Sequence, residues 1–187
     1  MEPDLHQITD NIKIIDYIFA GEALITVRNE DTKNRFTFKI QRRKNPHKIK
    51  IDLWWVSVLT MPNNGDKGSY KFIGALSREK GFKHSDKSYI KNTSQSIEVA
   101  YYYFNRLLGF GQFPLHSNIR TYHNGYCGRC GRLLTVPESI ATGYGEECSR
   151  LMNVPYEVPK GQSQYTIFDQ PNSGIADYQI QHSNNFV

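Results

Sequence analysis

The sequence predicts an α+β fold, in which one or two helices pack on a small antiparallel sheet, followed by a compact cysteine-bearing unit and an extended tail. Strand-like alternation lies between two segments of helical periodicity, at 9–20 and 94–108. All three cysteines fall within 22 residues near the C-terminal end. The chain of 187 residues therefore divides into a body at 1–118, a cysteine unit at 119–152 and a tail at 153–187.

The first helix is expected over 9–20, where apolar residues recur at helical spacing. Thr9 or Asp10 can cap its start, and Gly21 can end it in a left-handed conformation. Its predicted apolar face consists of Ile12, Ile15, Ile18 and Phe19.

Four strands are expected after this helix, at 23–27, 35–41, 53–60 and 70–76. The second shows strict alternation of apolar and polar residues, which is typical of a half-buried strand. The third is nearly all apolar and is expected in the middle of the sheet. Its neighbouring residues Trp54 and Trp55 must point to opposite faces.

The second helix is expected over 94–108, with Ser94 as its cap and Gly109 as its stop. Its apolar stripe consists of Ile97, Ala100, Phe104, Leu107 and Leu108. The body is therefore a three- or four-stranded antiparallel sheet with helices packed on it.

The three cysteines have the spacing of a metal site. Cys127 and Cys130 form a Cys-x-x-Cys motif followed by glycine, the usual form of a zinc knuckle. Cys148 follows on a short helix expected at 146–152, where the helix dipole favours the thiolate. His123 stands four positions before Cys127 and completes a closed tetrahedron. The sequence therefore predicts one structural zinc ion in a unit of zinc-ribbon or treble-clef type, bound by His123, Cys127, Cys130 and Cys148.

Other interpretations of this segment stay open. His116 and Glu147 are alternative fourth ligands. A Cys127–Cys130 redox or disulfide pair is disfavoured, because redox motifs usually open a helix and the residues after Cys130 are β-prone. If the three sulfurs alone bound the metal, an open fourth position would permit catalysis, but the deaminase pattern of His-x-Glu before Pro-Cys-x-x-Cys is absent.

The segments 127–139 and 143–148 resemble a family of uncharacterised bacteriophage and bacterial proteins. Its signature is C-x-x-C-G-R-x-L-T-x-P-x-S followed by G-x-G-P-x-C, and the resemblance is specific over 122–149. Glu146 stands where that family usually has proline, so the turn before Cys148 lacks this restraint. The resemblance implies zinc binding and a phage context, and it implies no activity.

Positive charge is concentrated in the first 152 residues. The formal net charge is +5, and residues 153–187 hold one lysine against three acidic residues, which leaves +7 for residues 1–152. Two basic segments are candidates for phosphate contact: the loop expected at 41–50 and the arginines beside the cysteines. The alternatives are a solvated loop and arginines that neutralise the thiolates. The candidate nucleic-acid-binding residues are Arg42, Arg43, Lys44, Lys48, Lys50, Arg129 and Arg132.

The tail from residue 153 is rich in proline, glycine, glutamine, asparagine and serine, which indicates an extended or flexible segment. Within it, 164–168 resembles the pentapeptide that binds bacterial sliding clamps, with Tyr165 in place of the usual leucine. The alternative is a strap that docks on the protein's own body. The candidate partner-binding residues are Gln164, Tyr165, Ile167 and Phe168.

No nucleophile–base pair, phosphate loop or paired-carboxylate motif is present, so we expect no enzymatic activity. The absence of a long apolar run and of a signal peptide predicts a cytoplasmic protein in the host cell, with no membrane partner. The expected role is that of a zinc-binding accessory protein, phage-encoded, that associates with nucleic acid in replication, repair or transcription. The alternative is a phage interaction factor that binds and inhibits a host or defence protein.

Overall fold

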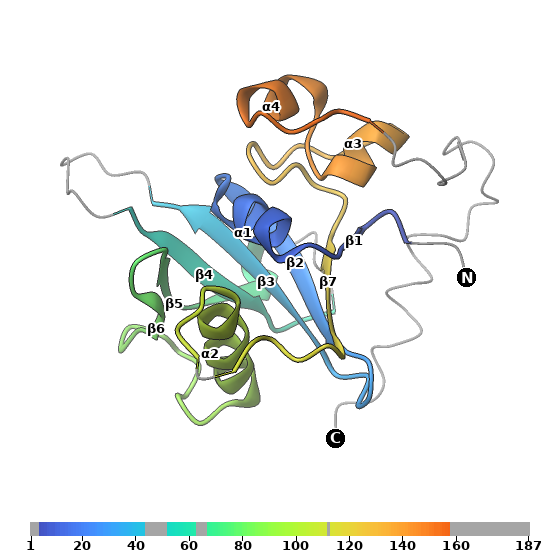
Figure 1. Ribbon diagram of the computed structural model, residues 1–187. Helices are drawn as coiled ribbons and strands as arrows, with labels where there is room; N and C mark the ends of the chain where they lie inside the picture. Colours follow the sequence, from blue (N-terminus) through green and yellow to red (C-terminus); the bar gives the residue numbers. More distant parts are fainter. Residues whose placement is uncertain (1–3, 44–51, 63–66, 112, 158–187) are drawn as a thin grey trace.

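The computed structural model describes residues 4–43, 52–62, 67–111 and 113–157. Within them, seven strands form one antiparallel sheet in the order β1-β7-β2-β3-β4-β5-β6 (Figure 1). The strands are β1 (Gln7–Ile8), β2 (Glu22–Asn29), β3 (Arg35–Arg42), β4 (Trp54–Leu59), β5 (Tyr70–Ser77), β6 (Gly81–His84) and β7 (Ile119–His123).

Four α-helices and one short 3₁₀ turn complete the described part of the chain. They are α1 (Asn11–Phe19), η1 (Lys67–Ser69), α2 (Gln95–Leu107), α3 (Pro137–Thr142) and α4 (Glu146–Leu151). Figure 1 shows α1 and α2 on the same side of the sheet, and α3 and α4 beyond one end of it. The predicted α+β fold is confirmed.

The two long helices form for the reasons that the sequence indicates. The Asp10 side chain caps α1 by accepting hydrogen bonds from the backbone N–H groups of Ile12 and Lys13. The helix is rotated about its axis from the expected orientation. Ile12 is 70% exposed, whereas Ile14 and Tyr17 are buried.

In α2, four members of the expected stripe and Tyr103 are buried, whereas Leu108 follows the helix and is half-buried. Ser94 precedes the helix as expected, but its side chain makes no capping hydrogen bond.

The sheet is larger than the three or four strands expected. β1 and β6 are too short to show alternation, so local pattern does not reveal them. β7, which the sequence placed in the cysteine unit, pairs with both β1 and β2. The body and the cysteine unit consequently share strands.

The two faces of the sheet differ in chemistry. On the face toward α1 and α2, buried side chains such as Ile25, Phe38 and Val56 pack against Ile18 and Phe104. No helix of the described residues covers the opposite face, which we call the open face (Figure 1). Its members alternate with the core residues and include Arg28, Arg35, Lys39, Trp55, Phe72 and Arg120.

Strand alternation separates the two adjacent tryptophans, as the sequence predicts. Trp54 is 4% exposed and makes an edge contact with Phe19 of α1, with ring centroids 4.7 Å apart. Trp55 is 38% exposed and lies on the open face.

Among the described residues, no helix has the length and apolar character that a membrane crossing requires.

Candidate metal centre

The segment after β7 folds into a tight turn that holds the first two cysteines. The backbone N–H of Cys127 donates to Arg132 O at 2.8 Å, and that of Gly131 donates to Cys127 O at 2.9 Å. Gly131 has φ +72°, a conformation that favours glycine. An antiparallel bridge between Tyr126 and Leu133 closes the hairpin. The turn and hairpin expected around the first two cysteines are therefore present.

Cys148 comes from α4, which begins two residues earlier at Glu146. The path from the hairpin to α4 passes through α3, where Pro137 occupies the start of the helix and the Ser139 hydroxyl donates to Val136 O at 2.8 Å. Gly143 ends α3 in the left-handed conformation. These local signals return the chain toward Cys127 and Cys130.

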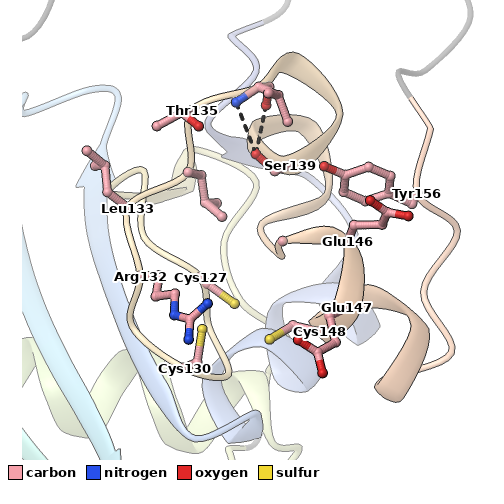
Figure 2. Close-up of a pocket in the computed structure, with 13 residues that line it drawn as sticks. Cys127, Cys130, Arg132, Leu133, Thr135, Ser139, Glu146, Glu147, Cys148 and Tyr156 are labelled. Carbon is pink, nitrogen blue, oxygen red and sulfur yellow. Dashed lines mark hydrogen bonds between the residues drawn. The ribbon is translucent and has the colours of Figure 1, made fainter.

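The three sulfur atoms lie within 4.8 Å of one another (Figure 2). A tetrahedral zinc site with bonds of about 2.3 Å has sulfur–sulfur separations of about 3.8 Å, so the group needs only a small contraction to bind an ion. Cys127, Cys130 and Cys148 are free thiols. The three cysteines can therefore hold a metal ion together.

Tyr17 of α1 anchors the knuckle to the body. Its hydroxyl donates to Tyr126 O at 2.6 Å. Gly128 lies so close to its ring that a Cβ at that position would be 2.7 Å from two ring carbons, which only glycine avoids. Cys127 and Cys148 belong to the same buried cluster as Tyr17. The cysteine unit and the sheet therefore share one core.

The surroundings of the sulfurs act on their thiol pKa values in opposite directions. For Cys127, burial raises the pKa, but the backbone N–H groups of Cys130, Gly145 and Arg129 together bring it below its ordinary value. For Cys148, burial raises the pKa to about 11, although the Arg129 guanidinium partly offsets this. Its Nη1 donates to Cys148 Sγ at 3.8 Å.

The structure does not bring His123, the expected fourth ligand, into this group. β7 directs its side chain into the core between His6 and Tyr17, with ring centroids 4.8 and 5.8 Å away. Its Nδ1 accepts a hydrogen bond from the backbone N–H of Gly125 at 3.2 Å. Burial and, to a lesser extent, the neighbouring His6 lower the pKa of His123 to about 4, so the ring is neutral at pH 7. His123 stabilises the junction between the sheet and the knuckle.

The two alternative fourth ligands are also outside the group. His116 is exposed, with its Nδ1 2.7 Å from Asn118 Oδ1. Glu147 is exposed and lies beside Cys148 (Figure 2). It lines a cavity of about 230 Å³ next to the sulfurs, together with Glu146 and Tyr156. Sequence reasoning missed this cavity, because Tyr156 and α3 meet the cysteines only in three dimensions.

The structure brings together two basic segments that lie far apart in the sequence. The backbone N–H of Arg42 donates to Gly21 O at 2.7 Å, and that of Glu22 donates to Gly128 O at 2.7 Å. Arg42 and the knuckle therefore bond to adjacent residues, Gly21 and Glu22, at one end of the sheet. Arg132 is exposed at this end, whereas Arg129 contacts Cys148.

Arg42 and Arg43 each contact a tryptophan. The Arg43 guanidinium lies 5.3 Å from the centroid of Trp55, and that of Arg42 lies 5.7 Å from Trp54. Arg42 also forms an exposed ion pair with Asp52 at 3.0 Å. The remaining candidates lie outside the described residues: Lys44, Lys48, Lys50, Gln164, Tyr165, Ile167 and Phe168.

The comparisons with known proteins concern the cysteine unit. Residues 120–153 match a family of unknown function, DUF6011. No curated protein and no solved structure was found to match the chain. The match runs from β7 to just beyond α4, so the chain is similar to this family over the segment that holds Cys127, Cys130 and Cys148.

Proposed function

We propose that this chain is a zinc-stabilised, non-catalytic phage protein that associates with nucleic acid as an accessory factor in replication, repair or transcription. The observation that carries the proposal is that the backbone of Arg42 and the cysteine hairpin that bears Arg132 contact adjacent residues, Gly21 and Glu22, at one end of the sheet. Surface cations that gather at one place attract a polyanion more strongly than the same charges dispersed.

The donor set supports zinc as the metal. Thiolates are soft ligands that select zinc, copper(I) or iron–sulfur clusters, and a pair in a knuckle with a third on a short helix is typical of structural zinc. Backbone N–H groups directed at Cys127 stabilise its thiolate, as outer-shell donors do in metal sites. A bound zinc ion would deprotonate the thiols and link the knuckle to α4.

A donor on the cavity side of the three sulfurs would supply the fourth ligand. We propose Glu147 or a water molecule in preference to His123, because Glu147 lines this cavity and His123 does not. Cobalt(II) substitution tests this assignment. A tetrahedral spectrum that is unchanged in His123→Asn and shifted in Glu147→Gln would support it, whereas the reverse would restore the histidine.

The nucleic-acid proposal is tested by titrating fluorescein-labelled oligonucleotides with the zinc-loaded full chain at two salt concentrations. Arg42→Ala/Arg43→Ala should weaken binding to all sequences alike and reduce the salt dependence, because phosphate contacts carry no sequence information. Lys13→Ala/Lys80→Ala removes two exposed charges elsewhere and serves as the control. If the wild-type chain binds neither single strands nor duplex at low salt, the proposal fails and the host-protein inhibitor takes its place.

A further inference from the structure

The open face carries a row of three arginines, of which Arg120 donates to the carbonyl oxygens of Ser117 and Ile119. In the strand register, Arg28 is directly opposite Arg120 on one side and Arg35 on the other. Like charges directly opposite in a sheet are destabilising, because their Cβ atoms are only about 5 Å apart. Glu30 places a carboxylate beside the row. Its Oε1 lies 3.6 Å from Arg28 Nε, and its Oε2 lies 3.3 Å from Lys33 Nζ. Among the described residues, no carboxylate forms an ion pair with Arg35 or Arg120.

The same face carries aromatic side chains that alternate with cations. Trp55 and Phe72 make an edge contact, with ring centroids 5.2 Å apart. The Lys39 ammonium lies 5.7 Å from the centroid of Tyr70, and the Arg43 guanidinium lies 5.3 Å from that of Trp55. Three aromatic rings and two cations therefore lie together on neighbouring strands.

The arginine row and Trp55 lie toward opposite ends of the open face, and Lys39 and Phe72 lie at a level between them. Arg35 begins β3, and Gln41, six residues later on the same strand, is directly opposite Trp55. At about 3.3 Å per residue, Arg35 and Trp55 are about 20 Å apart along the strand direction. An elongated polyanion with exposed flat rings can contact both at once, whereas a compact anion can contact only one.

We propose that the open face is a binding platform for single-stranded nucleic acid, with phosphates on Arg28, Arg35 and Arg120 and unpaired bases stacked on Trp55. Charge complementarity selects a polyanion, and accessible ring faces select unpaired bases over duplex, whose bases are already stacked. This inference rests on the proposed nucleic-acid association. It specifies which surface binds the nucleic acid and that the nucleic acid is single-stranded.

The test is fluorescence anisotropy of the zinc-loaded full chain with a fluorescein-labelled dT12 single strand and with a 12-base-pair duplex. The single strand should bind more tightly than the duplex. Trp55→Ala should weaken single-strand binding at least about fivefold, as the loss of one base stack does. Tyr89→Ala removes an aromatic residue that is 95% exposed outside the open face and should leave binding unchanged.

A second variant tests the contribution of the arginine row to binding. Arg28→Gln/Arg35→Gln should reduce the slope of log affinity against log salt by about 1.4, because each phosphate contact on a single strand contributes about 0.7. Lys13→Ala/Lys80→Ala should leave the slope as in wild type. Unfolding curves of each variant, measured at the same zinc concentration, separate lost binding from lost fold.

The outcomes distinguish this inference from the function on which it rests. If the wild type binds single strands but both open-face variants bind equally well, the platform is overturned while nucleic-acid association stands. Equal or tighter binding of the duplex also overturns it. If the wild type binds neither probe at low salt, the proposed function and the platform fail together.

Discussion

The cysteine end and the open face of the sheet differ in what their side chains do for stability. At the cysteine end, Tyr17, Gly128 and His123 are buried, closely packed and part of the core that joins the two units. On the open face, Arg28 and Arg35 are directly opposed and Trp55 is 38% exposed. Side chains that break a local stability rule are often found at functional sites. We therefore propose that the first region serves folding and the second serves recognition.

The largest effect is expected from Cys130→Ser at the cysteine end. Apparent zinc affinity should fall by more than about 100-fold, since even the loss of an outer-shell partner costs about 10–100-fold. Zinc content after dialysis and thermal unfolding with and without zinc measure the effect. Cys130 is exposed, so its removal disturbs little packing. Leu133→Ser, at another exposed position of the same hairpin, should retain zinc. Equal zinc content in Cys130→Ser and wild type would show that this cysteine is not a ligand.

The two tryptophans sharpen the comparison between the faces of the sheet. Trp54→Ala should lower the free energy of unfolding by about 3–5 kcal/mol, because it leaves a cavity against Phe19. Trp55→Ala should lower it by less than about 1 kcal/mol, because the side chain is partly in solvent already. Urea unfolding monitored by circular dichroism gives both values. Equal losses would mean that the open face is packed against another part of the chain.

His123 should make the free energy of unfolding depend on pH. In the unfolded chain the histidine takes up a proton near pH 6.5, whereas burial holds the folded pKa at about 4. Its contribution is therefore fully present above pH 6.5 and is lost as the pH falls toward 4, with about 2 kcal/mol gone by pH 5. His123→Asn should show a shallower decline between pH 7.5 and 5. Acid release of zinc affects both proteins, so the difference between their slopes isolates the histidine. Identical slopes would contradict this role.

Local pattern predicts most of the fold and the cysteine triad. The Asp10 cap of α1, the apolar periodicity of α2 and the alternation in β3 depend on neighbouring residues, so the sequence alone reveals them. Strand pairing depends on distant residues. The position of β7 between β1 and β2, the rotation of α1 that exposes Ile12 and the burial of His123 therefore did not follow from pattern.

The candidate sites divide in the same way. The spacing of the cysteines reveals a metal site because its ligands are close in sequence. The arginine row was missed because Arg28, Arg35 and Arg120 become neighbours only through register. Alternation does place Arg35 and Lys39 on one face, and this was the signal that could have indicated the open face.

The smallest effect on stability is expected at Arg35, and it tests the central claim most directly. Arg35→Gln relieves repulsion from Arg28 and breaks no ion pair of the described residues, so the free energy of unfolding should rise by a few tenths of a kcal/mol. The same substitution should weaken binding of a dT12 single strand. Unfolding and binding measured side by side on one preparation should therefore change in opposite directions. Lower stability with unchanged binding would show that Arg35 serves the fold, and would contradict the assignment of the open face to recognition.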